Sequence, residues 1–182
     1  MESAKTLGTT IISEISTCFD KLDPLNLQNL QIMINRANNI FVLGAGRSKI
    51  LLSTFCMRLN HLGYPSYVAG EVPCPPAKQG DLIIVASGSG ETKSVLSVLT
   101  KAKEQGAEIA LFTASPKSPI AQLSELIVDI PAPNQLQQST SSCQLMRTLF
   151  EQVMFISCES IIAFLSQGKS VDEIVANHTN LE

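Results

Sequence analysis

The chain has 182 residues, of which 45% are hydrophobic and 16% charged, and its formal net charge is −3. This length and composition predict a single domain over residues 1–182, and the absence of any basic run argues against a nucleic-acid partner. The charged share is below the roughly 25% of an average soluble domain, which hints that part of the surface is buried between copies of the chain.

The first elements in chain order are two helices within residues 1–38. Apolar residues recur at close to helical spacing from Thr6 to Phe19, which predicts the first helix. Asp23 is suited to be the N-cap and Pro24 the first residue of a second helix, which runs to about Asn38.

Residues 39–130 then alternate between short apolar runs and helical patterns. The runs predict strands at Ile40–Gly44, Pro65–Gly70, Asp81–Ser87, Ala107–Thr113 and Glu125–Ile130. Between them we expect helices at Lys49–Gly63 and Glu91–Gly106 and a short one at Ser118–Ser124. Strands that are apolar throughout are typical of a parallel sheet covered on both faces. The fold class is therefore α/β: an open five-stranded parallel sheet flanked by helices, a flavodoxin-like three-layer αβα arrangement.

The C-terminal part is predicted to be a loop, a long helix and a tail. The loop is Pro131–Thr140, and the helix lies within residues 140–167, from about Ser142 to Ser166. In the tail, residues 170–182, Ser170 and Glu173 have the spacing of a capping box that begins a last short helix.

Cysteine and histidine usage gives little support to a metal site. The five cysteines contain no CxxC pair, and the two histidines are far apart. Scattered cysteines are typical of a reducing compartment, so we expect a cytoplasmic protein. The most apolar stretch, Val153–Leu165, is too short to span a bilayer, and no membrane partner is expected.

Two loops rich in glycine and serine follow predicted strands, "GAGRS" (Gly44–Ser48) and "SGSGET" (Ser87–Thr92). Ligands bind open α/β sheets where strands end at their carboxyl edge, and the amides at a helix start attract anions. The hydroxyls of Ser48, Ser87, Ser89 and Thr92 and the Gly88 amide suit a small dianion such as a sugar phosphate. The alternative is that these residues only form tight turns and cap helices.

Other phosphate and catalytic motifs fit less well. Gly44 and Gly46 begin a dinucleotide fingerprint, but Lys49 occupies its third glycine position. The chain has no Gly-Lys-Ser/Thr of a Walker loop, and Ser87 replaces the first glycine of a nucleophile elbow. We therefore expect no cofactor.

The two loops, together with "MRLNHLG" (Met57–Gly63) and "LFEQ" (Leu149–Gln152), resemble the SIS (sugar isomerase) domain family, and within it the 6-phospho-3-hexuloisomerases. The resemblance implies a cofactor-free homotetramer that interconverts D-arabino-hex-3-ulose 6-phosphate and D-fructose 6-phosphate in the ribulose monophosphate route. It implies that the four hydroxyl residues bind the phosphate, that Glu151 is the catalytic base and that His61 is a second acid or base.

The chemistry of this reaction is general acid–base catalysis through an enediolate, in which one carboxylate shuttles the carbon-bound proton and a second group moves protons among the oxygens. Gln144, Arg147 and Glu151 have the spacing of one helix face, although such a face is also typical of a solvent-exposed stripe. Gly46, Arg47, Glu71, Gln144 and Arg147 are the remaining candidate substrate contacts.

One position departs from the family pattern. The family usually has Gln-Pro-Met-Gly before Leu-Phe-Glu-Gln, and this chain has Gln144-Leu145-Met146-Arg147. Three roles are open for Arg147: pairing with Glu151, which would weaken that carboxylate as a base, holding substrate oxygens, or filling space that the substrate needs. The open functional alternatives are another aldose–ketose phosphosugar isomerase and a phosphosugar-binding SIS protein without activity.

Overall fold

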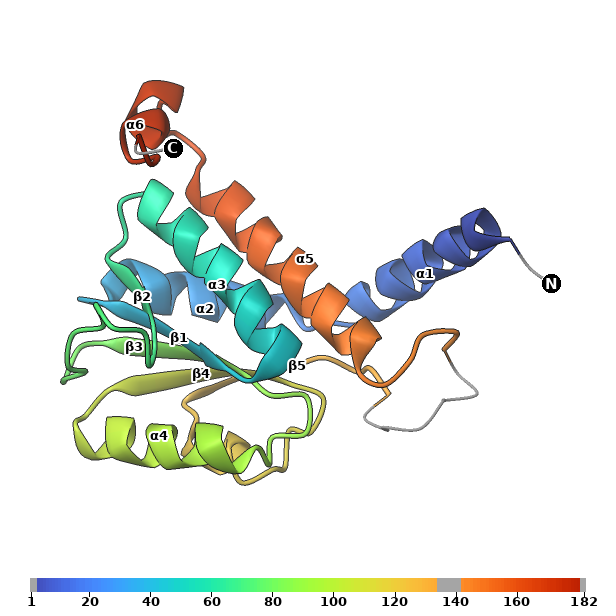
Figure 1. Cartoon of the computed structure of the whole chain (residues 1–182), viewed down its shortest axis with the longest axis horizontal. Helices are drawn as coiled ribbons and strands as arrows, with labels where there is room; N and C mark the ends of the chain where they lie inside the picture. Colours follow the sequence, from blue (N-terminus) through green and yellow to red (C-terminus); the bar gives the residue numbers. More distant parts are fainter. Residues whose placement is uncertain (1–2, 134–141, 181–182) are drawn as a thin grey trace.

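A five-stranded, all-parallel sheet with the strand order β2-β1-β3-β4-β5 lies at the centre of the molecule (Figure 1). Its strands are β1 (Ile40–Gly44), β2 (Ser66–Val68), β3 (Leu82–Ala86), β4 (Glu108–Thr113) and β5 (Leu126–Asp129). The computed structural model describes residues 3–133 and 142–180. The sheet confirms the predicted fold class, and β1 has the predicted bounds.

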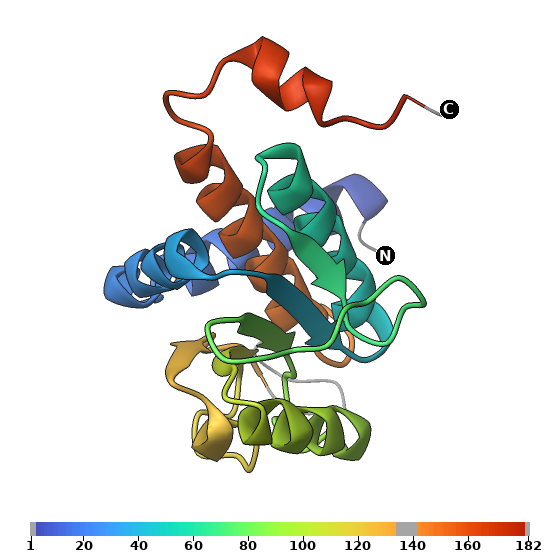
Figure 2. The ribbon, with the colours of Figure 1, turned by 90° about the vertical axis from the view of Figure 1, so that its left-hand side faces the viewer.

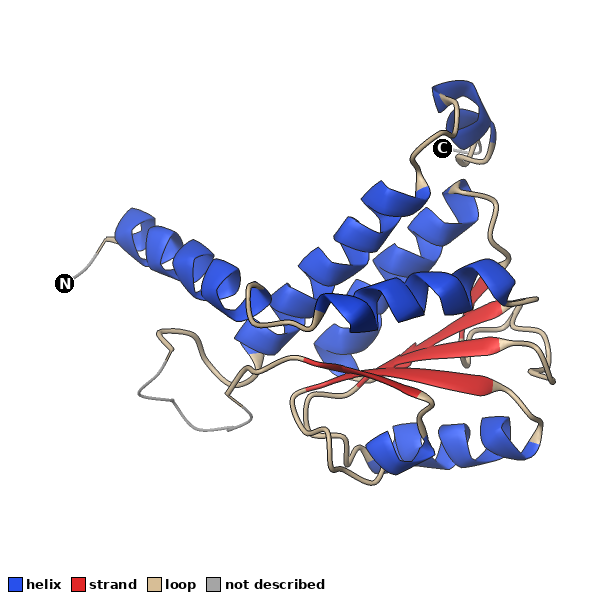
Figure 3. Ribbon diagram, turned by 180° about the vertical axis from the view of Figure 1, so that it is seen from behind, coloured by secondary structure: helices blue, strands red, loops and turns tan. Residues whose placement is uncertain are grey.

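Helices cover both faces of the sheet, as continuous apolar strands require. The helix α4 (Lys93–Glu104) and the short 3-10 helix η1 (Ala121–Leu123) lie on one face, and α2 (Pro24–Arg36), α3 (Gly46–His61) and α5 (Thr148–Leu165) lie on the other (Figure 3). Alternate residues of each strand pack against the helices on opposite faces of the sheet. Phe41 and Ile83 belong to the buried cluster beneath α4, whereas Val42 and Ile84 belong to the cluster with α2, α3 and α5.

The helix α1 (Ala4–Phe19) projects from this body (Figure 1). Its C-terminal part packs against α5, and Cys18 is its one fully buried residue. At the far end of α3 and α5 lies α6 (Val171–Ala176), which Figure 2 shows well separated from α4. The predicted capping box is present, because Ser170 accepts from the Glu173 amide and Glu173 accepts from the Ser170 amide.

The prediction for α2 is confirmed and that for α3 is corrected. The Asp23 carboxylate accepts from the Leu25 amide at 2.9 Å, so Asp23 is the N-cap of α2. The helix α3 begins at Gly46, three residues before the predicted Lys49. The second half of "GAGRS" is therefore the first turn of a helix and not a loop.

The predicted start of α5 at Ser142 is wrong, because the helix begins at Thr148. Met146 has a φ of +55°, a left-handed conformation that interrupts any helix, and Arg147 is the N-cap. Part of the loop predicted at Pro131–Thr140, residues 134–140, lies outside the described residues.

The helix α5 has the length and mean hydropathy, 18 residues and 1.5, that a membrane span would have. It nevertheless packs against α1, α2 and α3 and buries Phe150, Val153 and Ile161 in the core. Its apolar character is explained by this contact with three neighbouring helices.

Candidate active site

A cleft of about 360 Å³ opens at the carboxyl edge of the sheet. Three segments line it: residues 45–48 at the start of α3, residues 86–89 and Thr92 between β3 and α4, and residues 146–148, 150 and 151 at the start of α5. The first two meet because β1 and β3 are neighbours in parallel register, with Gly44 opposite Ala86. The cleft therefore brings together the two loops that the sequence singles out.

The loop after β3 is held by hydrogen bonds around Ser87. The Ser87 Oγ accepts from the Gly90 amide at 3.1 Å and lies 3.1 Å from the Thr92 Oγ1. The Ser87 carbonyl accepts from the Thr113 Oγ1 at 2.8 Å. Ser87 thus shapes the turn, in agreement with the alternative in which these residues form tight turns and cap helices. Thr92, however, makes no side-chain capping bond to α4. The Thr92 hydroxyl is not used as a helix cap.

Two glycines of this loop are required by close neighbours. A β-carbon on Gly90, whose φ is +64°, would lie 1.8 Å from the Ser118 Oγ. A β-carbon on Gly88 would lie 2.8 Å from the Arg147 Cδ and 3.2 Å from the Phe150 Cδ1. Gly88 therefore lets Arg147 and the start of α5 approach the loop.

Three helices begin at the cleft without side-chain caps. Their N-cap residues are Ala45 for α3, Thr92 for α4 and Arg147 for α5, and none makes a side-chain capping bond. The first amides of a helix have no partner within it and carry partial positive charge. Such amides, together with nearby hydroxyls, form a common binding site for phosphate. Arg47 and Arg147 add two positive charges to the residues that line the cleft.

Glu151 is the one acid among the described residues that line the cleft. Its Oε2 accepts from the Arg47 Nε at 2.5 Å, and its side chain is 14% exposed against 64% for Arg47. Arg147 was one predicted partner, but the ion pair of Glu151 is made with Arg47, which lies on another helix. The Glu151 carboxylate is therefore mostly buried, and the hydrogen bond from Arg47 on α3 orients it.

The structure brings most of the predicted site residues together at this cleft. They are Gly46, Arg47, Ser48, Ser87, Gly88, Ser89, Thr92, Arg147 and Glu151. Gln144 and Glu71 do not line this cleft. The Gln144 Nε2 donates to the Glu14 Oε2 at 3.1 Å, and Gln144 precedes α5, so the predicted helix face with Glu151 does not exist. Glu71 pairs with the Lys49 Nζ at 2.7 Å.

His61 lies at the opposite end of α3 from the cleft. It is fifteen residues after Gly46, and at 1.5 Å per residue this is about 22 Å along the helix. Within one chain His61 therefore lies far from Glu151, and its role as a second acid or base stays a prediction. Its ring centroid is 4.9 Å from that of His178. Burial, and then the charges of His178 and Arg58, lower the pKa of His61.

Sequence reasoning missed several features of the site. Met146, Thr148 and Phe150 line the cleft but belong to no motif that signals binding. Arg47 was expected to contact substrate, and its pairing with Glu151 gave no sequence signal. Residues 3–133 and 142–180 contain no group of three or more His, Cys, Asp or Glu side chains suited to a metal ion.

Comparisons with known proteins identify the family of this chain. The SIS domain family matches residues 33–156. The 3-hexulose-6-phosphate isomerase of Mycobacterium gastri, whose name is a synonym of the predicted activity, is 37% identical and covers 99% of this chain and 96% of the relative. The enzyme of the same name from Bacillus subtilis is 37% identical over 80% of this chain and 81% of the relative.

A solved structure is similar over nearly the whole chain. It is a hypothetical protein from Methanococcus jannaschii, described as inferring a 3-hexulose-6-phosphate isomerase function. It has a TM-score of 0.83 and 30% identity, and covers 96% of this chain and 98% of that one. This chain therefore belongs to the SIS domain family, in the branch that includes the 3-hexulose-6-phosphate isomerases.

Proposed function

We propose that this protein is a 3-hexulose-6-phosphate isomerase, which interconverts D-arabino-hex-3-ulose 6-phosphate and D-fructose 6-phosphate. Relatives of that name cover up to 99% of the chain at 37% identity. The observation that carries the proposal is the position of Glu151. An oriented carboxylate lies in the same cleft as an anion cradle of hydroxyls and uncapped helix starts.

The phosphate of the substrate is proposed to bind the loop after β3 and the start of α3. Ser48, Ser87, Ser89 and Thr92 supply hydroxyls there, and the first amides of α3 and α4 supply further donors. A cleft of about 360 Å³ lies within the usual range for small-molecule sites, roughly 300–1,000 Å³. The sugar chain then extends from the phosphate toward Glu151 on α5.

The reaction moves a carbonyl from C3 to C2. Glu151 removes the proton from C2, the electron pair of the C–H bond forms the C2–C3 double bond, and C3–O becomes the enediolate oxygen. Glu151 then returns the proton to C3 as the C2–O carbonyl forms, while the hydroxyl proton moves from the C2 oxygen to the C3 oxygen. Arg47 lies beside Glu151 in the cleft, where its positive charge stabilises the negative charge that develops on these oxygens, whereas Arg147 lies against Gly88 of the phosphate loop.

The decisive experiment replaces the carboxylate and keeps its size. Glu151→Gln is expected to lower turnover of the hexulose phosphate by about 10²–10⁴-fold, with fructose 6-phosphate binding preserved. Glu159→Gln, eight residues later on the same helix, is the matched control and is expected to keep wild-type turnover. Full turnover by Glu151→Gln would exclude Glu151 as the base.

The wild-type protein separates the alternatives in a panel of phosphosugars. Turnover of a pentose phosphate alone would assign another aldose–ketose isomerase. Binding without turnover of any substrate would assign a non-catalytic SIS protein.

We also propose that the protein is a cytoplasmic homotetramer. The support is the low share of charged residues and several exposed apolar side chains, among them Ile12 at 70%, Ile50 at 65% and Leu145 at 65%. Interfaces of obligate homo-oligomers are rich in apolar side chains, so association would cover such residues. Light scattering after size-exclusion chromatography tests the oligomeric state.

A further inference from the structure

We propose that Glu14, on α1, is a positioning residue for the candidate active site. Its carboxylate holds residues 142–147, which we call the lead-in segment, so that Arg147 lies across the phosphate loop at Gly88. The inference rests on the proposed function, because it assigns a role in binding the same phosphosugar. Glu14 itself does not line the cleft.

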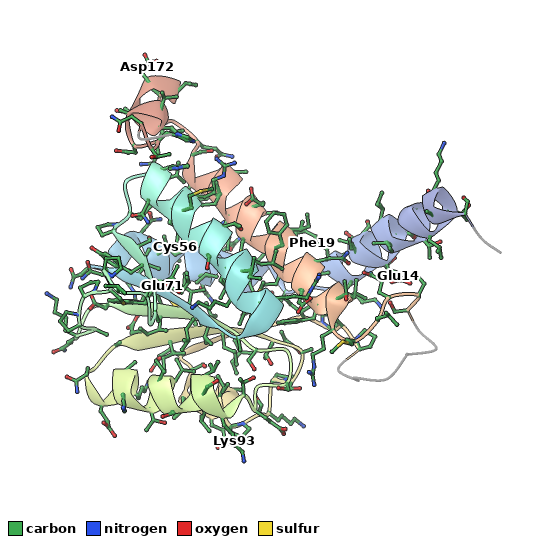
Figure 4. The ribbon with its side chains drawn as sticks, in the orientation of Figure 1. Glu14, Phe19, Cys56, Glu71, Lys93 and Asp172 are labelled. Carbon is green, nitrogen blue, oxygen red and sulfur yellow. The ribbon has the colours of Figure 1, made fainter. Side chains whose placement is uncertain are left out.

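Three consecutive residues of the lead-in segment donate to this one carboxylate. The Ser142 Oγ donates to the Glu14 Oε2 at 2.7 Å, and the Gln144 Nε2 donates to the same oxygen at 3.1 Å. The Cys143 amide donates to the Glu14 Oε1 at 2.8 Å. Figure 4 marks Glu14 on α1, the helix that packs against α5. Both carboxylate oxygens therefore bind a segment that lies about 130 positions away in the sequence.

The electrostatics of Glu14 agree with this role. Burial on its own would raise the pKa of Glu14, but the hydrogen bonds from the Cys143 amide, Ser142 and Gln144 together bring the pKa below its ordinary value. Hydrogen bonds to an ionised carboxylate are stronger than those between neutral groups. The lead-in segment is thus fixed by a charged acceptor at neutral pH.

Gln144, which Glu14 binds, is only three positions from Arg147, which lines the cleft. Gln144 is followed by Leu145, by Met146 with its φ of +55°, and by Arg147, the N-cap of α5. A non-glycine residue in the left-handed region persists where its surroundings fix it. Glu14 supplies the fixed point on the N-terminal side of this turn. The Thr148 amide and hydroxyl, which donate to the Leu145 carbonyl at 3.2 Å and 2.8 Å, close it on the other side.

Arg147 shows what this fixed turn does for the site. Its Cδ lies so close to Gly88 that an alanine methyl there would approach it to 2.8 Å. The Arg147 side chain therefore packs against the phosphate loop, and the position of its backbone depends on the turn before it. The Arg147 carbonyl also accepts from the Glu151 amide at 3.1 Å, so the first turn of α5 begins from the same point.

Removal of the Glu14 carboxylate would leave three donors of the lead-in segment without their acceptor. Gln144 is buried, so its amide would be left without an acceptor and would gain by moving toward water. Loss of Glu14 is therefore expected to displace the segment, and with it Arg147.

The test begins with Glu14→Gln, which replaces one acceptor oxygen by an amide donor at the same size. We expect the KM for the hexulose phosphate to rise roughly five- to tenfold, because only part of the free energy of the lost charge-assisted hydrogen bond is transmitted to the phosphate site. The kcat is expected to stay within about threefold. Hydrogen exchange of the Cys143 amide is expected to accelerate, because this amide donates to Glu14.

The matched control is Glu104→Gln, which removes the same charge at the exposed end of α4 and is expected to leave all of these values unchanged. A second experiment combines Glu14→Gln with Arg147→Ala. If Glu14 acts through Arg147, the KM of the double variant equals that of Arg147→Ala, because the two effects are not additive. Full additivity would overturn the proposal, as would wild-type KM and wild-type Cys143 exchange in Glu14→Gln.

Two further measurements keep the test informative. If Glu14→Gln does not fold, Ser142→Ala removes one hydrogen bond to Glu14 and is expected to give a smaller rise in KM of the same kind. If the wild-type protein has no isomerase activity, the Kd for fructose 6-phosphate replaces KM in every comparison. An unchanged Kd would then reject the role of Glu14, whereas the missing turnover rejects the proposed function separately.

Discussion

Arg47 and Glu151 are 104 positions apart in the sequence, yet the Arg47 Nε and the Glu151 Oε2 lie 2.5 Å from each other in the cleft. The helices α3 and α5 pack along each other, and both begin at the carboxyl edge of the sheet (Figure 1). The pair therefore links the first turn after one glycine-rich loop to the proposed catalytic base. It fixes the Glu151 carboxylate from outside its own helix.

Removing this partner is expected to impair catalysis. Arg47→Ala leaves Glu151 without its charge-assisted hydrogen bond, and we expect the loss of orientation to outweigh the loss of the neighbouring positive charge, so that kcat for the hexulose phosphate falls about tenfold. Arg47→Lys keeps the charge without the planar guanidinium and is expected to lie between wild type and Arg47→Ala. Steady-state kinetics with Arg58→Ala, at the other end of α3, as control provide the check. Wild-type kcat in Arg47→Ala would show that Glu151 does not depend on this ion pair.

A methyl group at Gly88 is expected to weaken substrate binding. It would lie 2.8 Å from the Arg147 Cδ and 3.2 Å from the Phe150 Cδ1. Arg147 is able to shift, but Phe150 is only 1% exposed and packed in the core. We expect Gly88→Ala to raise KM about tenfold and to cost about 1 kcal/mol of stability from overpacking. Gly8→Ala in α1, where a methyl group meets no atom within 4 Å, is the control. A KM equal to that of wild type would mean that Arg147 does not contribute to the phosphate site.

Gly90 is expected to be essential for folding stability rather than for chemistry. Alanine at its φ of +64° costs about 1–2 kcal/mol in backbone strain. The overlap with the Ser118 Oγ, 1.8 Å from the new methyl, adds about 1–3 kcal/mol. Gly70→Ala has the strain of a φ of +86° without any atom within 4 Å, so it isolates the first contribution. Urea unfolding of both variants gives the difference, and equal losses would contradict the packing argument.

The buried His61, at the C-terminal end of α3, is expected to make stability depend on pH near neutrality. The pKa of His61 is lowered, first by burial and then by His178 and Arg58, while Glu159 lines the same small cavity. The unfolded chain therefore takes up a proton at His61 at a higher pH than the folded chain does. Stability is full above the ordinary histidine pKa of about 6.5, and it is lost as pH falls below that value toward the lowered pKa of the folded state.

The measurement is urea unfolding between pH 7.5 and pH 5.5. His61→Leu is expected to lose less stability over this range than the wild-type protein, because it cannot be protonated at this position. His178→Ala removes the ring beside His61 and is expected to reduce the pH dependence in part. An identical slope in all three proteins would show that His61 does not control it.

The sequence determines most of this fold locally, which is why its pattern was enough for the strands and for the cap at Asp23. The residues of the two glycine-rich loops were also predictable, because parallel strands bring their carboxyl ends to one edge. The start of α5 was not predictable. Its lead-in segment follows a helical pattern, but a carboxylate on α1 holds Ser142 and Gln144 in another conformation. The Arg47 ion pair likewise depends on how α3 and α5 pack.

The pairing of Gly44 with Ala86 also has a consequence for the order of folding. The two halves of the proposed phosphate cradle follow β1 and β3, and they meet only when these two strands, which are separated in the chain by α3 and β2, pair with each other. Because closing the chain between them costs entropy before the contact forms, we expect such non-local contacts to form late. The binding site is then expected to be absent from the folding transition state and present only in the native state. A bound phosphosugar would therefore stabilise the native state and not the transition state. It is expected to slow unfolding and to leave the folding rate unchanged.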